Sequence, residues 1–163
     1  MSLLTRTRLF LLDMDGTFYL GEKLLPGALE FIDLCRARDI GFLFLTNSSS
    51  KHSGQYCDKL RRLGLEITPE RIFGAGEATA IYLQKRQPAA RVYVVGTPAL
   101  EQELAQHGLA LVDARPDFAV LGFDTTLTYE KLWRLCDLVR AGTPYVATHP
   151  DYNRRSSPRC RST

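Results

Sequence analysis

The stretch that decides the fold is Arg8-Leu9-Phe10-Leu11-Leu12-Asp13-Met14-Asp15-Gly16-Thr17. Its apolar run, residues 9–12, predicts a buried strand of a parallel sheet. The strand ends in two carboxylates, Asp13 and Asp15, at the edge where open parallel sheets bind ligands. On an extended chain these two side chains point to the same side, so their charges repel unless a cation separates them or one is protonated. Because Mg²⁺ takes one or two carboxylate ligands, the pair predicts a magnesium site, with a solvated Asp-Gly turn as the alternative.

Outward from this stretch, strands and helices alternate in two successive sets. The first set has strands at residues 9–12, 41–46 and 72–74 and helices at residues 26–38 and 53–63. The second has helices at residues 77–86, 98–107 and 128–140 and strands at residues 91–96, 118–122 and 144–148. This alternation predicts an α/β fold with parallel sheets and right-handed crossovers. Gly74-Ala75-Gly76 predicts a hinge between the two sets, because glycine permits backbone geometries that other residues avoid.

Composition narrows the class of protein. A chain of 163 residues with 45% hydrophobic residues suits one domain or two small ones. No apolar run is long enough to span a membrane and the first residues show no signal peptide, so we expect a cytoplasmic protein with no membrane partner. The four cysteines form no Cys-x-x-Cys pair, and we expect Cys35, Cys57 and Cys136 to be core or semi-buried thiols. A packed helix face is predicted for Leu132, Trp133, Leu135, Cys136 and Val139.

The net charge of +3 arises from the end of the chain. Residues 154–163 carry four arginines and no acidic residue, so the remainder is close to neutral and nucleic acid is not an expected partner. Low apolar content and a terminal position predict that these ten residues are disordered.

A second polar cluster follows the strand predicted at residues 41–46. Thr46, Asn47 and Ser48 would share one crevice with the two aspartates if the strands are neighbours. A helix N-cap cluster is the alternative for these residues taken alone. Together the two clusters suit phosphoryl transfer, in which Asp13 attacks phosphorus and Asp15 protonates the leaving oxygen and later activates water.

The same two clusters would also supply the groups that bind phosphate. The Thr46 hydroxyl and backbone N–H groups near Asn47 and Ser48 can hold phosphate oxygens, and we assign Gly16 and Thr17 to the same set. Mg²⁺, held by Asp13 and Asp15, offsets the charge between carboxylate and phosphate.

These motifs resemble a known family. Leu12-Asp13-Met14-Asp15-Gly16-Thr17 and Phe44-Leu45-Thr46-Asn47-Ser48-Ser49 are similar to motifs one and two of haloacid-dehalogenase superfamily phosphatases, and residues 6–153 resemble the para-nitrophenylphosphatase-like subgroup. The resemblance implies an aspartate nucleophile at Asp13, an acid/base at Asp15 and a phosphate-binding threonine at Thr46. It also implies Mg²⁺ as cofactor and a small phosphorylated metabolite as substrate. The implied fold is a Rossmann-like parallel core, partial here, with an α/β cap of the C2 type. The domains would be residues 1–76 for the core, 77–153 for the cap and 154–163 for the tail.

One departure from the family pattern matters for activity. Family members continue with a phosphate-binding lysine and an acidic motif that completes the Mg²⁺ site. None of this chain's lysines, Lys23, Lys51, Lys59, Lys85 and Lys131, lies at the end of a later core strand. We therefore expect a truncated chain that holds half of the active site and is weak or inactive.

Two other functions remain open. The chain could be a non-catalytic interaction module, or a half-protein completed by another chain or a second copy through an exposed sheet edge or the cap. A receiver-like phosphoacceptor is disfavoured, since its acidic pair and its phosphoacceptor lie on different strands.

Overall fold

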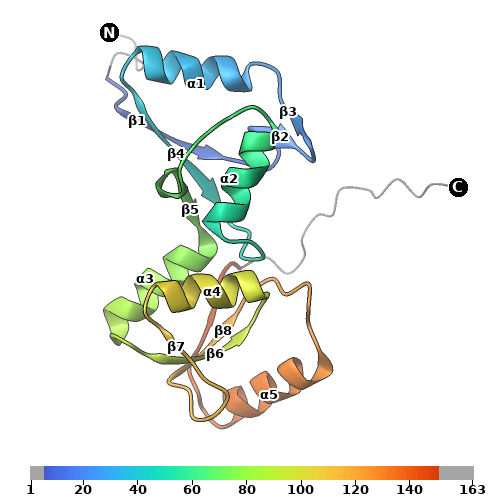
Figure 1. Ribbon diagram of the computed structural model, residues 1–163. Helices are drawn as coiled ribbons and strands as arrows, with labels where there is room; N and C mark the ends of the chain where they lie inside the picture. The colour runs from blue at the N-terminus through green and yellow to red at the C-terminus, as the bar shows by residue number, and fades with distance from the viewer. Residues whose placement is uncertain (1–5, 151–163) are drawn as a thin grey trace, which may run out of the picture.

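The computed structural model describes residues 6–150. The predicted disordered tail and the last residues of the predicted cap, 151–153, lie outside the described residues. Figure 1 shows two parts, one built on a sheet near the N-terminus and the other on a second sheet. In chain order the elements are β1 (Leu9–Asp13), β2 (Tyr19–Leu20), β3 (Lys23–Leu24), α1 (Ala28–Ala37), β4 (Gly41–Thr46), α2 (Ser53–Arg62), a 3₁₀ turn (Pro69–Arg71), β5 (Ile72–Gly74), α3 (Ala75–Arg86), β6 (Arg91–Val95), α4 (Pro98–Gln106), β7 (Ala110–Leu111), β8 (Phe118–Leu121), α5 (Tyr129–Arg140) and β9 (Tyr145–Ala147).

The first part is a three-stranded parallel sheet with the order β1-β4-β5. Helices α1 and α2 pack on the sheet face that carries Phe42 and Phe44, where Phe44 is fully buried. The rings of Phe18 and Phe42 meet Phe44 edge-on, with centroids 4.9 Å and 5.8 Å away. The predicted α/β alternation is confirmed for this part, and the aromatic cluster fixes the sheet under its two helices.

The other face of this sheet is open among residues 6–150. Leu9 and Leu11 of β1 are 52% and 59% exposed, whereas Phe10 and Leu12 between them are packed against the core. The prediction of a strand buried on both faces is therefore wrong for the described part of the chain. Parallel sheets normally have both faces covered, so this face lacks the cover that the apolar pattern led us to expect.

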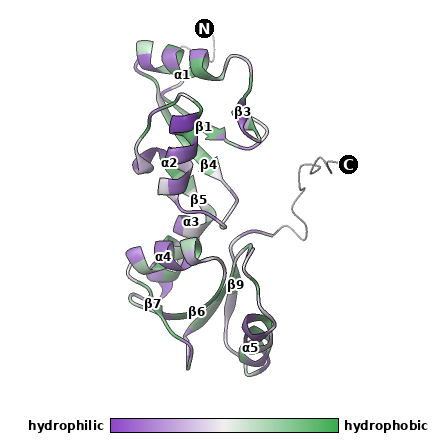
Figure 2. Cartoon of the chain, turned by 45° about the vertical axis from the view of Figure 1, so that its right-hand side comes forward, coloured by the Kyte–Doolittle hydropathy of each residue, from purple (hydrophilic) through white to green (hydrophobic). Residues whose placement is uncertain are grey.

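The second part is a four-stranded parallel sheet with the order β7-β6-β8-β9. Side chains alternate along β6, so Val92 and Val94 face α3 and α4, whereas Tyr93 and Val95 face α5. Figure 2 shows the hydrophobic colouring concentrated on the strands and more hydrophilic colouring on helices such as α2. The strand β7, two residues long, was not predicted.

The junction between the two parts differs from the prediction. β5 ends at Gly74, which is also the N-cap of α3, and the helix begins at Ala75. The segment Gly74-Ala75-Gly76 does lie between the two parts, but its last two residues form the first turn of a helix and are buried, so it is not a separate linker.

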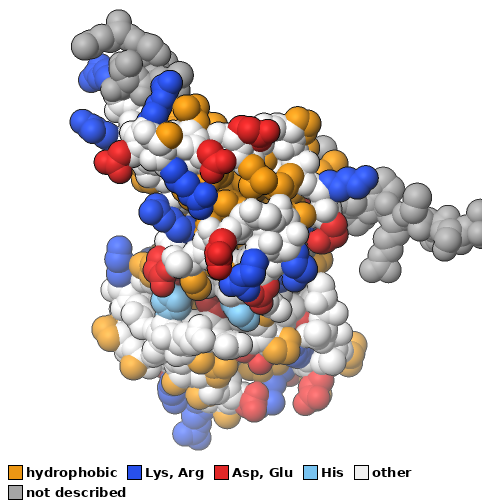
Figure 3. Space-filling model, turned by 45° about the horizontal axis from the view of Figure 1, so that its top comes forward, with side chains coloured by type: hydrophobic (Ala, Val, Ile, Leu, Met, Phe, Trp, Pro, Cys, Tyr) orange, Lys and Arg blue, Asp and Glu red, His pale blue; other side chains and the backbone are white. Residues whose placement is uncertain are grey.

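Helix α5 is less covered than its sequence suggested. Leu135 is buried, but the other predicted members of the packed face are exposed, so the prediction is wrong for Leu132, Trp133, Cys136 and Val139. Figure 3 shows hydrophobic side chains at the surface of both parts of the molecule, between acidic and basic ones. Of the helices within residues 6–150, none combines the length and apolar character that crossing a bilayer requires.

Candidate active site

The loop after β1 carries both predicted aspartates on its exposed side. Asp13 and Asp15 are exposed, whereas Met14 between them is 1% exposed. The Met14 carbonyl accepts hydrogen bonds from the N–H groups of Phe18 and Tyr19, at 3.0 Å and 3.1 Å. These buried neighbours anchor the loop, so the two carboxylates project together from a fixed backbone.

Gly16 and Thr17 complete this loop. Gly16 has φ +86°, a left-handed conformation that costs little for glycine, and its N–H donates to the Tyr19 carbonyl at 2.8 Å. The Thr17 hydroxyl donates to Asp13 Oδ2 at 3.4 Å. The turn thus folds the chain back beside Asp13, and the short strands β2 and β3 that follow pair as a small antiparallel hairpin.

The second predicted cluster lies at the same end of the sheet. Asp13 of β1 is in register with Leu45 of β4, and Thr46 is the next residue. The Thr46 hydroxyl accepts a hydrogen bond from the Ser48 N–H at 3.2 Å, which leaves its own proton available to a ligand oxygen. The strand ends that carry the two motifs are therefore neighbours.

The helix N-cap alternative for this cluster is wrong. α2 begins at Ser53 and its N-cap is His52, whose Nδ1 accepts from the Gly54 N–H at 3.1 Å. Gln55 Oε1 accepts in turn from the His52 N–H at 3.2 Å. Thr46, Asn47 and Ser48 are thus not used to cap a helix.

The side chains of Asp13 and Thr46 point to opposite faces of the sheet. Strand alternation directs Asp13 to the open face with Leu11, and Thr46 to the helix-covered face with Phe44. A ligand that touches both must therefore lie over the strand ends rather than on either face. The two exposed carboxylates fit the preference of Mg²⁺ for one or two carboxylates plus water and phosphate oxygens. Within residues 6–150, no group of three or more His, Cys, Asp or Glu side chains could hold a metal ion.

Lys59 of α2 is a residue near this loop that sequence reasoning missed. It is 9% exposed, and its Nζ lies 3.8 Å from the centroid of the Tyr19 ring and 3.7 Å from Glu22 Oε1. Burial lowers the pKa of Lys59, while the negative charges of Glu22 and Asp15 oppose that effect. The spacing of Tyr56, Lys59 and Leu60 on one helix face is the signal that could have revealed its burial.

A second acidic position, Asp124 after β8, forms a turn and an ion pair instead of a ligand site. Its Oδ1 accepts from the N–H and hydroxyl of Thr126, at 2.7 Å and 2.6 Å, and its Oδ2 accepts from Lys131 Nζ at 3.1 Å. Burial alone would raise the pKa of Asp124, but these hydrogen bonds outweigh it and the pKa is lowered. Lys131 also donates to the Gly96 carbonyl at 2.8 Å, so its charge is used within the second part.

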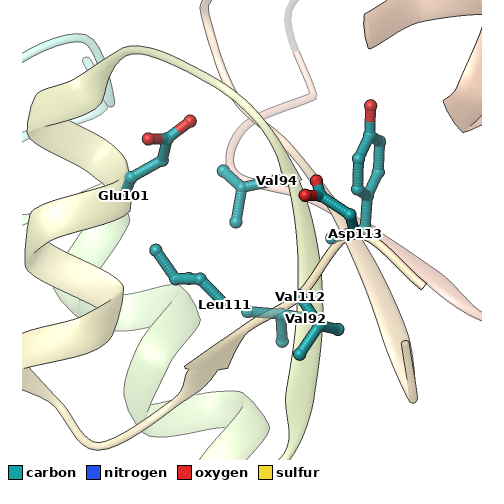
Figure 4. A pocket seen from close by; sticks show the side chains of 7 residues that line it. Val92, Val94, Glu101, Leu111, Val112 and Asp113 are labelled. Carbon is teal, nitrogen blue, oxygen red and sulfur yellow. The ribbon is translucent and has the colours of Figure 1, made fainter. Parts of the chain in front are cut away.

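One cavity of the second part is lined by none of the predicted site residues. Figure 4 shows this cavity of about 180 Å³, with Glu101 of α4 and Asp113, which follows β7, on its rim. Its remaining lining residues are Val92, Tyr93, Val94, Leu111 and Val112. Because two carboxylates, aliphatic side chains and the Tyr93 ring form its wall and no lysine or arginine among residues 6–150 lines it, the cavity does not suit a phosphate.

Comparison with known proteins identifies the family. Residues 10–110 match the family model of haloacid dehalogenase-like hydrolases, and the chain belongs to this family. The match includes both strand-end motifs.

Among its relatives is an acid sugar phosphatase of Staphylococcus aureus, 37% identical over 143 residues, which are 87% of this chain and 55% of that protein. The crystal structure of a 4-nitrophenylphosphatase from Thermotoga maritima superposes with a TM-score of 0.92 and 44% identity, covering 96% of this chain and 60% of that one. A glycerol phosphate phosphatase from Mycobacterium tuberculosis, in complex with magnesium, has a TM-score of 0.85 and 32% identity, covering 92% and 46%. The chain thus spans roughly half to three fifths of the length of these relatives.

Proposed function

We propose that this chain carries the nucleophile half of a Mg²⁺-dependent phosphomonoester hydrolase acting on small phosphorylated metabolites. The observation that supports it most is the register of β1 with β4, which sets Asp13 beside Leu45 and so next to Thr46. The names of the relatives, an acid sugar phosphatase and a glycerol phosphate phosphatase, support phosphomonoesters as the substrate class.

The proposed reaction uses the described residues in two steps. An Asp13 oxygen attacks phosphorus, the bond to the leaving oxygen breaks, and Asp15 gives that oxygen a proton. Asp15 then removes a proton from water, which attacks the aspartyl-phosphate and releases inorganic phosphate and free Asp13. The Thr46 hydroxyl and N–H groups of the following loop hold the phosphate oxygens. Mg²⁺, for which Asp13 and Asp15 supply carboxylate ligands, would lower the repulsion between carboxylate and phosphate.

Labelling of the nucleophile tests the proposal without requiring full turnover. The protein would be mixed with para-nitrophenyl phosphate and Mg²⁺, quenched in acid and analysed by mass spectrometry. We expect a phosphoryl group on Asp13 that accumulates in Asp15→Asn, because para-nitrophenolate needs little protonation to leave whereas hydrolysis of the intermediate needs the base. Asp13→Asn should abolish the label.

The control is Asp33→Asn, an exposed carboxylate of α1 that pairs only with Arg36, 3.5 Å away, among the described residues. It should leave labelling unchanged. Labelling at another residue, or none at Asp13 in either the wild type or Asp15→Asn, would refute the proposed nucleophile. Steady hydrolysis should be weak, since the lysine and acidic motif implied by the family are not among the described residues.

A second candidate is an interaction module whose open sheet face is covered by another chain. The exposure of Leu9 and Leu11 favours it, because apolar side chains on a parallel sheet are normally covered. Sedimentation of the purified protein tests this candidate, and a strict monomer up to high concentration would argue against a second copy as the cover.

A further inference from the structure

Ser49 joins the proposed phosphate-binding loop to the second part of the molecule. Its side chain is fully buried, and its hydroxyl oxygen accepts hydrogen bonds from the Phe123 N–H and the Thr148 hydroxyl, both at 2.9 Å. Phe123 lies two residues after β8 and Thr148 directly after β9. One hydroxyl in the first part therefore binds two strand ends of the second sheet.

A neighbouring contact repeats this connection. Thr97 lies between β6 and α4 and is the N-cap residue of α4. Its hydroxyl donates a hydrogen bond to the Ser50 carbonyl at 3.1 Å. Gly122 permits the close approach, because a Cβ at this position would lie 3.1 Å from Ser49 Oγ and 2.5 Å from Leu100 Cδ2. Three strands of the second sheet, β6, β8 and β9, thus present their carboxyl ends to the same loop.

The connected residues directly follow the proposed phosphate ligands. Ser48, whose N–H donates to Thr46 Oγ1, also has its hydroxyl 3.1 Å from the hydroxyl of Ser50. The loop of residues 46–50 is therefore attached at one end to β4 and at the other to the second sheet (Figure 1).

We propose that Ser49 is a positioning residue, through which the second sheet holds the phosphate-binding loop in its binding conformation. The inference rests on the proposed function for the meaning of the loop, but the order of the loop is independent of hydrolysis. N–H groups fixed before a ligand arrives need no reorganisation when negative charge reaches them, so a loop held in this way binds phosphate oxygens better than a free one.

Amide hydrogen exchange measured by NMR on the full chain, without substrate, tests the inference. In Ser49→Ala, exchange of the Ser48 and Phe123 amides should become about 5- to 30-fold faster, as expected when an opening costs one or two kcal/mol less. The amides of Leu60 in α2 and Leu104 in α4 report on the two hydrophobic cores and should keep their wild-type rates. Equal acceleration at all four amides would overturn the inference, because Ser49 would then stabilise the whole fold and not the loop.

A second variant removes the contact from the opposite side. Thr148→Val keeps the side-chain shape and deletes the donor hydroxyl, so Ser48 exchange should become about fivefold faster, and Thr148→Ser should restore it. Wild-type exchange of Ser48 in Thr148→Val would overturn the inference. Since no phosphoryl transfer is measured, failure of the proposed hydrolase activity and failure of this positioning role give different results.

Discussion

Replacing Glu103 by glutamine should remove much of the pH dependence of the protein's stability between pH 4.5 and 7. Glu103 lies in α4, is 5% exposed and lines a cavity of about 470 Å³ at the junction of the two parts. Burial raises the pKa of its carboxyl group from 4.5 to about 7, with His107 opposing the effect and Glu77 adding to it. His107 Nε2 lies 4.0 Å from Glu77 Oε1, and the carboxylate of Glu70 lines the same cavity.

The sign and size of the effect follow from this pKa. The folded protein keeps a proton on Glu103 up to about pH 7, whereas the unfolded chain loses it near pH 4.5. The resulting stability is fully present below pH 4.5 and is lost as pH rises through 7. A shift of this size corresponds to about 3 kcal/mol, because one pKa unit is worth about 1.4 kcal/mol. Glutamine is neutral throughout, so Glu103→Gln should match the wild type at acid pH and exceed it above pH 7 by up to about 3 kcal/mol.

Urea unfolding followed by circular dichroism across this pH range measures the difference directly. The matched control is Glu101→Gln, two residues earlier in α4, where the side chain is 36% exposed. It should keep the wild-type loss of stability with rising pH. A constant difference between Glu103→Gln and the wild type at every pH would refute the assignment of this loss to Glu103.

Two further predictions concern packing and acid stability. Phe44→Ala should destabilise the fold by about 3–5 kcal/mol in urea unfolding, because it empties the centre of the first core, whereas Leu9→Ala on the open face should cost only about 0.5 kcal/mol. Hydrogen bonds from Arg91 lower the pKa of Asp117 to about 2, so this carboxylate adds stability that is present above pH 3.8 and lost as pH falls towards 2. Asp117→Asn should therefore flatten that part of an acid-unfolding curve, and an unchanged curve would exclude the pair as its cause.

The strands that were predicted correctly have a clear pattern in their own residues. The strands β4 and β6 each contain four consecutive apolar residues, followed by Thr46 and Gly96, so the local sequence alone located them. The N-cap residue was predicted for α5 but not for α2. Thr128 was predicted as the N-cap of α5 and accepts from the Lys131 N–H at 3.2 Å. His52 was not predicted to cap α2, because histidine rarely takes that place.

The features that sequence reasoning missed depend on contacts between distant residues. β7 has only two residues, Ala110 and Leu111, and becomes a strand solely by pairing with β6. Glu103 is buried beside Leu104 because α3 packs against α4, which a helical pattern cannot distinguish from an exposed acidic position. The open face of β1 was missed for the opposite reason. An apolar run indicates that a strand suits burial, but it does not say which segment supplies the cover.

The same distinction applies to the candidate site. Asp13 and Thr46 could be placed at one sheet edge from sequence, because both end an apolar strand and parallel strands end together. Nothing local in Ser49 marked it as different from Ser48 and Ser50, although it alone of the three is fully buried. Its role follows from the orientation of the second sheet, whose strands also point their carboxyl ends at the loop after β4. A small hydroxyl side chain suits this position, since its oxygen accepts two hydrogen bonds and lies so close to Gly122 that a Cβ there would be 3.1 Å away. The carboxyl-terminal edges of the two sheets therefore meet at one loop, and a ligand held by Thr46 as proposed would lie next to the strand ends of the second sheet.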